Sequence, residues 1–232
     1  MKIREIYKRE GGCRVSLTMA GICLVITLIA FLWPNLYNAF GYAFPTEYPW
    51  QMFTGMFLHG SPEFSIWITL AHLGFNLLLL LPFGILIEKI IGSLKFFRLT
   101  VYLWAVNAIS FFIVAGMVTP QGEVGRGAGI SGIAFSYGII GGYIMVNLVR
   151  RDWKMMFKQV SFYLLMNMVF IMMVMINSST SGTSPMFIHI IAVIAGIGYL
   201  IVKHKDIDTL WKSQVKPQPS LRSKMEQTKK KK

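Results

Sequence analysis

The chain contains six separate runs of predominantly apolar residues, each close to the length of a membrane-spanning helix. A helix needs about 20 such residues to cross the hydrocarbon core of a bilayer. Charged residues make up only 14% of the chain, against about 25% in soluble domains, which argues against a water-soluble protein. We therefore expect an all-α membrane protein with six transmembrane helices. The predicted spans are residues 15–33, 66–87, 99–118, 130–149, 160–176 and 186–202.

The apolar runs divide the 232 residues into one membrane domain with a tail at each end. Residues 1–14 are a basic N-terminal segment, residues 15–203 the membrane domain, and residues 204–232 a basic tail. The tail is polar and ends in lysines, so we expect it to be disordered and to lie near anionic lipid. A purely solubilising tail explains the same composition. The first run is too long for a cleaved signal peptide, and we interpret it as a retained signal anchor.

The positive charges are distributed unevenly between the two sets of loops. All but one of the 23 Lys and Arg residues lie in the N-terminal segment, in the loops after the second and fourth spans, or from Lys203 onward. The exception is Arg126. Since basic loops stay inside, both termini are predicted to be cytoplasmic in the cell membrane, with residues 34–65, 119–129 and 177–185 outside. The net charge of +13 therefore orients the protein and does not indicate nucleic-acid binding.

The first outer loop, residues 34–65, is long and rich in aromatic residues. Aromatic side chains suit the headgroup layer of a membrane. We expect this loop to lie partly in the outer leaflet, with short helices.

Polar residues inside predicted spans are candidates for function, because they are costly in lipid. His72 and Asn76 lie four residues apart in the second span, so they share one helix face. Ser131 lies at the start of the fourth span and His189 near the start of the sixth. The three spans that carry these four residues have those ends on the outer side, so we expect the four side chains at similar depth in the membrane. No Asp, Glu, Lys or Arg lies well inside a span, which argues against a proton pump or a voltage sensor.

Ser131 lies in a glycine-rich segment, residues 127–132, where the backbone can turn tightly and expose N–H groups at a helix start. A serine becomes a nucleophile when a base such as His189 takes its proton. The developing oxyanion needs fixed donors, which the Ser131 N–H, Asn76 and His72 can supply. No carboxylate is available to orient His189, so the pattern predicts a dyad, with Phe135 packing against the ring.

Each of these features alone has an ordinary structural explanation. A Gly-x-Ser-Gly segment in a membrane helix is usually a packing motif, and a single membrane histidine is usually a helix contact. The combination of one serine, two histidines and one asparagine at matched depth favours catalysis.

At these residues the chain resembles the rhomboid family of intramembrane serine proteases, from about Trp50 to Tyr199. The motifs that carry the resemblance are the segments 72–76, 84–93 and 129–132, and His189 followed by Gly196. The resemblance implies a six-transmembrane-helix rhomboid-like bundle with Ser131 as nucleophile and His189 as base. It implies His72 and Asn76 as oxyanion donors, single-span membrane proteins as substrates, and helix five with the last outer loop as substrate gate. No cofactor and no metal are expected.

Three departures from the family pattern stand out. The usual Trp-Arg pair of the first loop is Trp50-Gln51, so the structural role of the arginine is expected to be unfilled. His59 and His72 are separated by an insertion around residues 61–69, and Ala192 replaces a glycine three residues after the base. None of them removes a catalytic group. The alternative function is a catalytically weak or inactive rhomboid-like protein that binds membrane protein clients.

Overall fold

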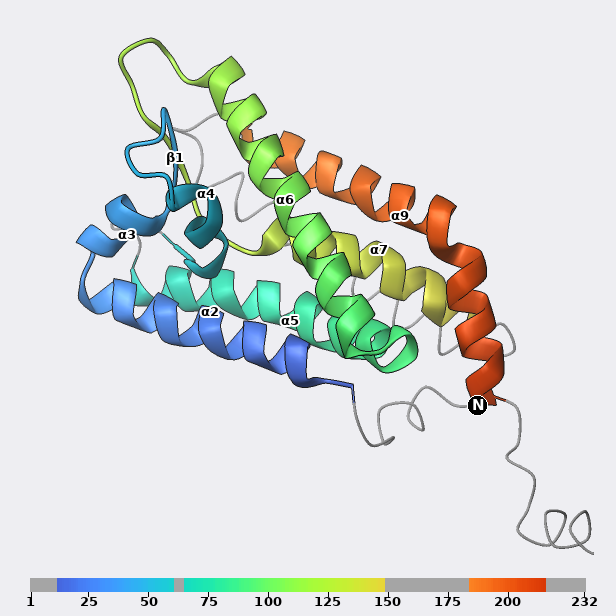
Figure 1. The fold of residues 1–232 in the computed structure, drawn as a ribbon. Helices are drawn as coiled ribbons and strands as arrows, with labels where there is room; N and C mark the ends of the chain where they lie inside the picture. Colours follow the sequence, from blue (N-terminus) through green and yellow to red (C-terminus); the bar gives the residue numbers. More distant parts are fainter. Residues whose placement is uncertain (1–11, 61–64, 149–183, 216–232) are drawn as a thin grey trace, which may run out of the picture.

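A computed structural model describes residues 12–60, 65–148 and 184–215. Within these ranges the chain forms a bundle of long helices, with short elements gathered at one end (Figure 1). The elements in chain order are α2 (Arg14–Leu32), α3 (Asn35–Phe40), β1 (Tyr42–Phe44), α4 (Gln51–Thr54), the 3₁₀ helix η1 (Gly55–Phe57), α5 (Ile66–Ile91), α6 (Ser93–Val118), β2 (Gly125–Gly127), α7 (Ser131–Leu148) and α9 (Ser184–Val215).

The long helices have the length and the surface of membrane-spanning segments. Four of them, α2, α5, α6 and α9, are long and apolar enough to cross a bilayer, and α7 contains a shorter apolar helix. Large apolar side chains point outward from these helices, for example Val25, Ile113, Ile194 and Ile201. Such a surface is costly in water and suits lipid. The predicted fifth span, residues 160–176, lies outside the described residues, so the count of six spans stays a prediction.

Helices α5 and α6 both extend beyond the predicted spans. Helix α5 ends at Ile91 instead of residue 87, and α6 begins at Ser93 instead of residue 99. The two helices are separated only by Gly92, whose φ of 83° suits glycine. The apolar pattern underestimates the length of both helices, because Lys and Arg side chains can keep their charge in water while the helix continues.

Helix α9 continues into the segment that the composition predicts to be a disordered tail. Ile207 is buried, and Leu210 and Trp211 pack against the same core, so one stripe of this extension faces the bundle. The Tyr143 hydroxyl of α7 also donates a hydrogen bond to Asp208 Oδ1, at 3.0 Å. Residues 204–215 are therefore helical, because a short apolar stripe offsets their polar composition. Residues 216–232 lie outside the described part of the chain.

The core of the bundle is formed where α5, α6 and α7 pack together. Tyr137 is fully buried, and its hydroxyl is hydrogen bonded to Thr100 of α6. A Cβ at Gly84 would lie 3.1 Å from the Ser16 hydroxyl of α2 and 3.5 Å from the Tyr137 ring. Small residues at such positions let membrane helices approach closely, which is the main source of their packing energy.

A buried carboxylate, Glu88, connects the start of α2 to the α5–α6 junction. One of its oxygens accepts hydrogen bonds from the N–H and hydroxyl of Ser16, at 2.9 and 2.8 Å. The other accepts from the Val15 N–H at 3.1 Å and the Ser93 hydroxyl at 2.7 Å. The carboxylate therefore satisfies the first N–H groups of α2, where a negative charge is also favoured by the helix dipole.

The opposite end of the bundle is covered by the short elements (Figure 1). Residues 34–65 contain the short helices expected there, namely α3, α4 and η1. An antiparallel pairing of β1 with β2 was not expected, and it aligns Tyr42 with Gly127 and Phe44 with Gly125. This two-stranded ribbon joins the first loop to the segment that leads into Ser131.

Candidate active site

The structure brings the side chains of Ser131 and His189 into contact. Ser131 is the first residue of α7, and His189 lies in the second turn of α9. The Oγ atom of Ser131 is 2.8 Å from Nε2 of His189. The Phe135 ring, one turn after Ser131, lies against the His189 imidazole with ring centroids 4.7 Å apart. The hydroxyl thus has a base within hydrogen-bond distance, and the base is held by an aromatic neighbour.

The backbone before Ser131 passes close to α5. Gly129 has a φ of 122°, which disfavours any residue with a side chain. A Cβ there would lie 3.4 Å from Nε2 of His72 and 3.7 Å from Nδ2 of Asn76. The Gly129 N–H donates to the Gly55 carbonyl at 3.0 Å. The turn therefore passes directly beside the two polar side chains of α5, in a backbone conformation that favours glycine.

The Asn76 amide is an unusual group in this fold. Asn76 is buried, and its Nδ2 atom has no hydrogen-bond partner among the described residues. A buried donor without a partner costs about 1–3 kcal/mol. Nδ2 faces the backbone at Gly129, where a Cβ would lie 3.7 Å away, so this donor points toward the turn that leads into Ser131.

His72 is oriented by the first loop. The Gly60 N–H donates a hydrogen bond to Nδ1 of His72, at 3.2 Å. With Nδ1 as acceptor, the proton of the neutral ring lies on Nε2, the atom that faces Gly129. The Nε2 atom of His72 and the Nδ2 atom of Asn76 therefore both face the backbone at Gly129.

The start of α7 contributes backbone donors. The first hydrogen bond at this helix start runs from the Ala134 N–H to the Ile130 carbonyl, at 3.0 Å. The N–H groups of the residues just before Ala134, including Ser131, precede that bond and are not used within the helix. They carry the positive end of the helix dipole.

The sequence gives His59 no role beyond its spacing from His72, and the structure places it beside the candidate site. Its ring is fully buried and packs edge-on against His72, with centroids 5.3 Å apart. Nδ1 lies 3.2 Å from the Thr27 hydroxyl, and Nε2 accepts from the Ile130 N–H at 3.5 Å. Burial, with the neighbouring His72 as a second cause, holds the pKa of His59 well below its usual range. The neutral ring therefore supports the backbone that leads into Ser131.

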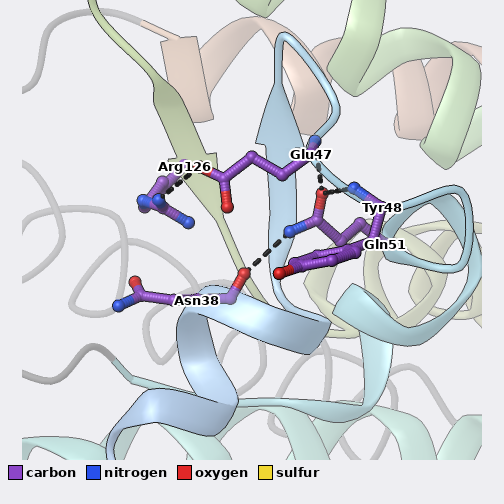
Figure 2. A network of polar contacts seen from close by, with 5 residues as sticks. All are labelled: Asn38, Glu47, Tyr48, Gln51 and Arg126. Atoms are coloured by element: carbon purple, nitrogen blue, oxygen red, sulfur yellow. Dashed lines mark hydrogen bonds and ion pairs between the residues drawn. The ribbon is translucent and has the colours of Figure 1, made fainter.

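Gln51 does have a structural role, contrary to the expectation for the missing arginine. Its side chain is fully buried, and Figure 2 shows its amide between the backbone of Asn38 and the backbone of Glu47 and Tyr48. Oε1 accepts from the N–H groups of Glu47 and Tyr48, at 3.0 and 3.1 Å, and Nε2 donates to the Asn38 carbonyl at 2.7 Å. A neutral amide can hold the turn because it combines an acceptor with a donor, which an arginine does not.

A positive charge beside Glu47 is provided by Arg126 of β2, in the loop between α6 and α7. Its guanidinium forms a 3.0 Å ion pair with Glu47, with both side chains about 40% exposed (Figure 2). An exposed pair of this kind contributes little stability. Together with the ribbon, it joins the first loop to the segment before Ser131.

The replacement of glycine by Ala192 does not separate α7 from α9. Ala192 is buried, and its carbonyl accepts a hydrogen bond from the Ser136 hydroxyl at 2.7 Å. A Cβ at Gly196, one turn further on, would lie 3.1 Å from the Ser136 carbonyl oxygen. The two helices are thus in close contact just below Ser131 and His189.

These observations define a class of protein: a multi-pass membrane protein with a serine and a histidine in contact inside its helix bundle. The chain belongs to the Rhomboid family, because the family model of the Rhomboid domain matches residues 46–206. That range contains all four predicted site residues. A search of curated proteins finds no match. The family relation supports the fold, while the chemistry of this chain depends on its own side chains.

Proposed function

We propose that the chain is an intramembrane serine protease that hydrolyses peptide bonds of transmembrane substrates through a dyad of Ser131 and His189. The observation that carries this proposal is the 2.8 Å distance between Ser131 Oγ and His189 Nε2. Rhomboid proteins are generally intramembrane proteases, although inactive members exist. Both groups of the dyad are present here and lie within hydrogen-bond distance.

The dyad acts in two stages, formation of an acyl-enzyme and its hydrolysis. Ser131 Oγ bonds to the carbonyl carbon of the scissile peptide while its proton passes to His189 Nε2. When the C–N bond breaks, the same proton goes to the leaving amine, and an acyl-enzyme remains. A water molecule then attacks the ester, gives a proton to Nε2, and releases the new carboxyl end. Finally the proton returns to Ser131 Oγ.

The oxyanion formed in each stage would lie beside Gly129. The donors that face it are the amide of Asn76, the imidazole N–H of His72, and the N–H of Ser131. Fixed donors of this kind cost no reorganisation during the reaction, and the loss of one typically lowers kcat by roughly 10²–10³-fold. The unpartnered Nδ2 of Asn76 supports this assignment.

The rival function is an inactive rhomboid-like protein that binds and escorts membrane clients. Such a protein needs neither a nucleophile nor a base. The contact between Ser131 and His189 and the buried donor on Asn76 are the groups that peptide hydrolysis requires, whereas client binding requires neither. They therefore favour the protease.

The proposed substrates are single-span membrane proteins that are cut near the outer face. A regular helix shields its peptide bonds, and unwinding it in hydrocarbon exposes polar groups at several kcal/mol each. Helix-breaking residues near the outer end of a substrate lower this cost. We expect cleavage at a small residue with helix breakers just downstream. Replacing those breakers by Leu in a model substrate should suppress product formation, as measured by mass spectrometry; unchanged cleavage would contradict this selectivity.

The proposed orientation has both termini in the cytoplasm of a cell, with the basic tail near anionic lipid. This follows from the distribution of Lys and Arg, because Arg126 is the exception among 23 basic residues. A periplasmic-type reporter fused after Lys232 should be silent, and one inserted near Ser179 should be active. The reverse pattern would place the dyad at the cytoplasmic face.

The direct test is cleavage of a single-span model substrate in proteoliposomes. The wild-type protein should release two products, and Ser131→Ala should release none. Ser110→Ala is the matched control, because this serine is buried but donates only to the Val106 carbonyl of its own helix, at 2.6 Å. Substantial cleavage by purified Ser131→Ala would contradict the proposal.

A further inference from the structure

Ser136 forms a buried hydrogen bond between the two helices that carry the dyad. Its side chain is fully buried. The hydroxyl lies 2.7 Å from the Ala192 carbonyl of α9 and 3.1 Å from the Gly132 carbonyl of α7. A hydroxyl has a single proton to donate, so the shorter contact, to α9, takes the larger share of the bond. Serines in membrane helices more commonly bond back to their own helix.

The backbones of α7 and α9 approach closely at the same level. A Cβ added to Gly196 would lie 3.1 Å from the carbonyl oxygen of Ser136 and 3.2 Å from its Cα atom. His189, Ala192 and Gly196 follow one another at helical spacing, so they form one stripe of α9. This stripe faces α7 from Ser131 to Ser136 and includes the dyad contact itself.

We propose that Ser136 is a positioning residue, which holds α7 against α9 so that His189 Nε2 stays within hydrogen-bond distance of Ser131 Oγ. In lipid there is no hydrophobic force that pulls helices together, so packing and interhelical hydrogen bonds set their spacing. Here the alanine at residue 192 adds a methyl group to the interface, and the Ser136 hydroxyl bonds the carbonyl of that same residue. This inference rests on the proposed function of the dyad.

Two matched variants separate positioning from simple stabilisation. Ser136→Ala removes the interhelical bond, while Ser110→Ala removes a buried serine hydroxyl whose bond stays within α6. Both delete one oxygen atom from a buried site. Ser136→Cys keeps the approximate volume and a weak donor, and it should give an intermediate result if Ser136→Ala is too unstable to purify.

The first readout is turnover of the model substrate in proteoliposomes. A misplacement of about 1 Å can lower a rate by 10²-fold, so Ser136→Ala should lower kcat by roughly 10–100-fold. KM should change by less than about twofold, because the substrate contacts are not altered. Ser110→Ala should keep kcat within about twofold of wild type. A kcat for Ser136→Ala equal to that of Ser110→Ala would overturn the proposal.

The second readout does not depend on activity. In protein labelled with ¹⁵N-histidine, the Nε2 resonance of His189 reports its hydrogen bond, and the chain has only 4 His to assign. Ser136→Ala should move this resonance toward its position in Ser131→Ala, and Ser110→Ala should leave it in place. If the wild type does not cleave but the resonance still moves, the positioning role stands and the protease function fails. If turnover falls and the resonance does not move, Ser136 acts in another way and the proposal is wrong.

Discussion

Two buried polar clusters at opposite ends of the bundle differ in how completely their hydrogen bonds are satisfied. Glu88 accepts bonds at both oxygens, from Val15, Ser16 and Ser93. Asn76, in the same helix, leaves its Nδ2 without a partner among the described residues. A satisfied buried group stabilises the native state, whereas an unsatisfied one lowers stability unless a ligand completes it. The contrast indicates that the Glu88 end maintains the fold, and it is consistent with the chemistry proposed for the Asn76 end.

The largest expected effect is on the dyad. Ser131→Ala and His189→Ala should each lower kcat by about 10³-fold or more, because the two groups act as a unit. The double variant should be little worse than either single one, and all three should unfold at the wild-type temperature. Turnover assays and thermal unfolding in detergent check this. Additive losses would show that the two residues act independently.

The Glu88 cluster should give a large effect on stability alone. Glu88→Ala leaves the first N–H groups of α2 and the Ser93 hydroxyl without their acceptor, and it should lower the free energy of unfolding by about 2–4 kcal/mol. Glu123→Ala, an exposed carboxylate in the loop after α6, is the control and should have no effect. Denaturant unfolding provides the measurement. A loss of kcat in the folded fraction of Glu88→Ala would contradict the assignment of stability to the Glu88 end and of the proposed chemistry to the Asn76 end.

Asn76→Ala should have the opposite effects, lowering kcat while leaving the free energy of unfolding nearly unchanged. It should lower kcat by roughly 10²–10³-fold through the loss of an oxyanion donor. Its free energy of unfolding should stay within about 1 kcal/mol of wild type, because no hydrogen bond within the described structure is broken. Steady-state kinetics and unfolding of the same preparation test both halves. A change in KM alone would make Asn76 a substrate contact instead.

The smallest expected effect is a pH dependence from His59. Its pKa is held well below the usual range in the folded protein, so the native ring stays neutral while the unfolded chain takes up a proton below about pH 6.5. Stability should therefore fall as the pH drops through this range. Between pH 7.5 and 5.5, wild type should lose about 1 kcal/mol more than His59→Gln. If the free energy of unfolding of the two proteins changed equally with pH, His59 would not be the source of this pH dependence.

The sequence predicts the positions of the described long helices well, because the length of an apolar run is a strong constraint in a bilayer. It also places Ser131 and His189 at the starts of two helices, and in the structure their side chains meet. Their catalytic roles stay predictions. The apolar pattern does not predict how far α9 continues, since a few residues such as Ile207 and Trp211 decide that.

Other features depend on tertiary contacts that no local pattern records. The strands β1 and β2 are short and lie far apart in the chain, so their pairing is visible only in the fold. The expected gap at Gln51 was wrong, because its side-chain amide makes three hydrogen bonds to the backbone, two at Oε1 and one at Nε2. His59 could have been suspected as a polar residue within the aromatic first loop, but its position next to His72 requires the folded backbone.

The most direct measurement of the central claim is covalent labelling with a fluorophosphonate, which reacts with activated serines. The intact mass of the wild-type protein should increase by one adduct, and fragmentation should place it on Ser131. His189→Ala should abolish the adduct, and Asn76→Ala should slow its formation, while Glu88→Ala should still react in its folded fraction. The absence of an adduct on wild type, or labelling of a different serine, would contradict the account and favour the client-binding alternative.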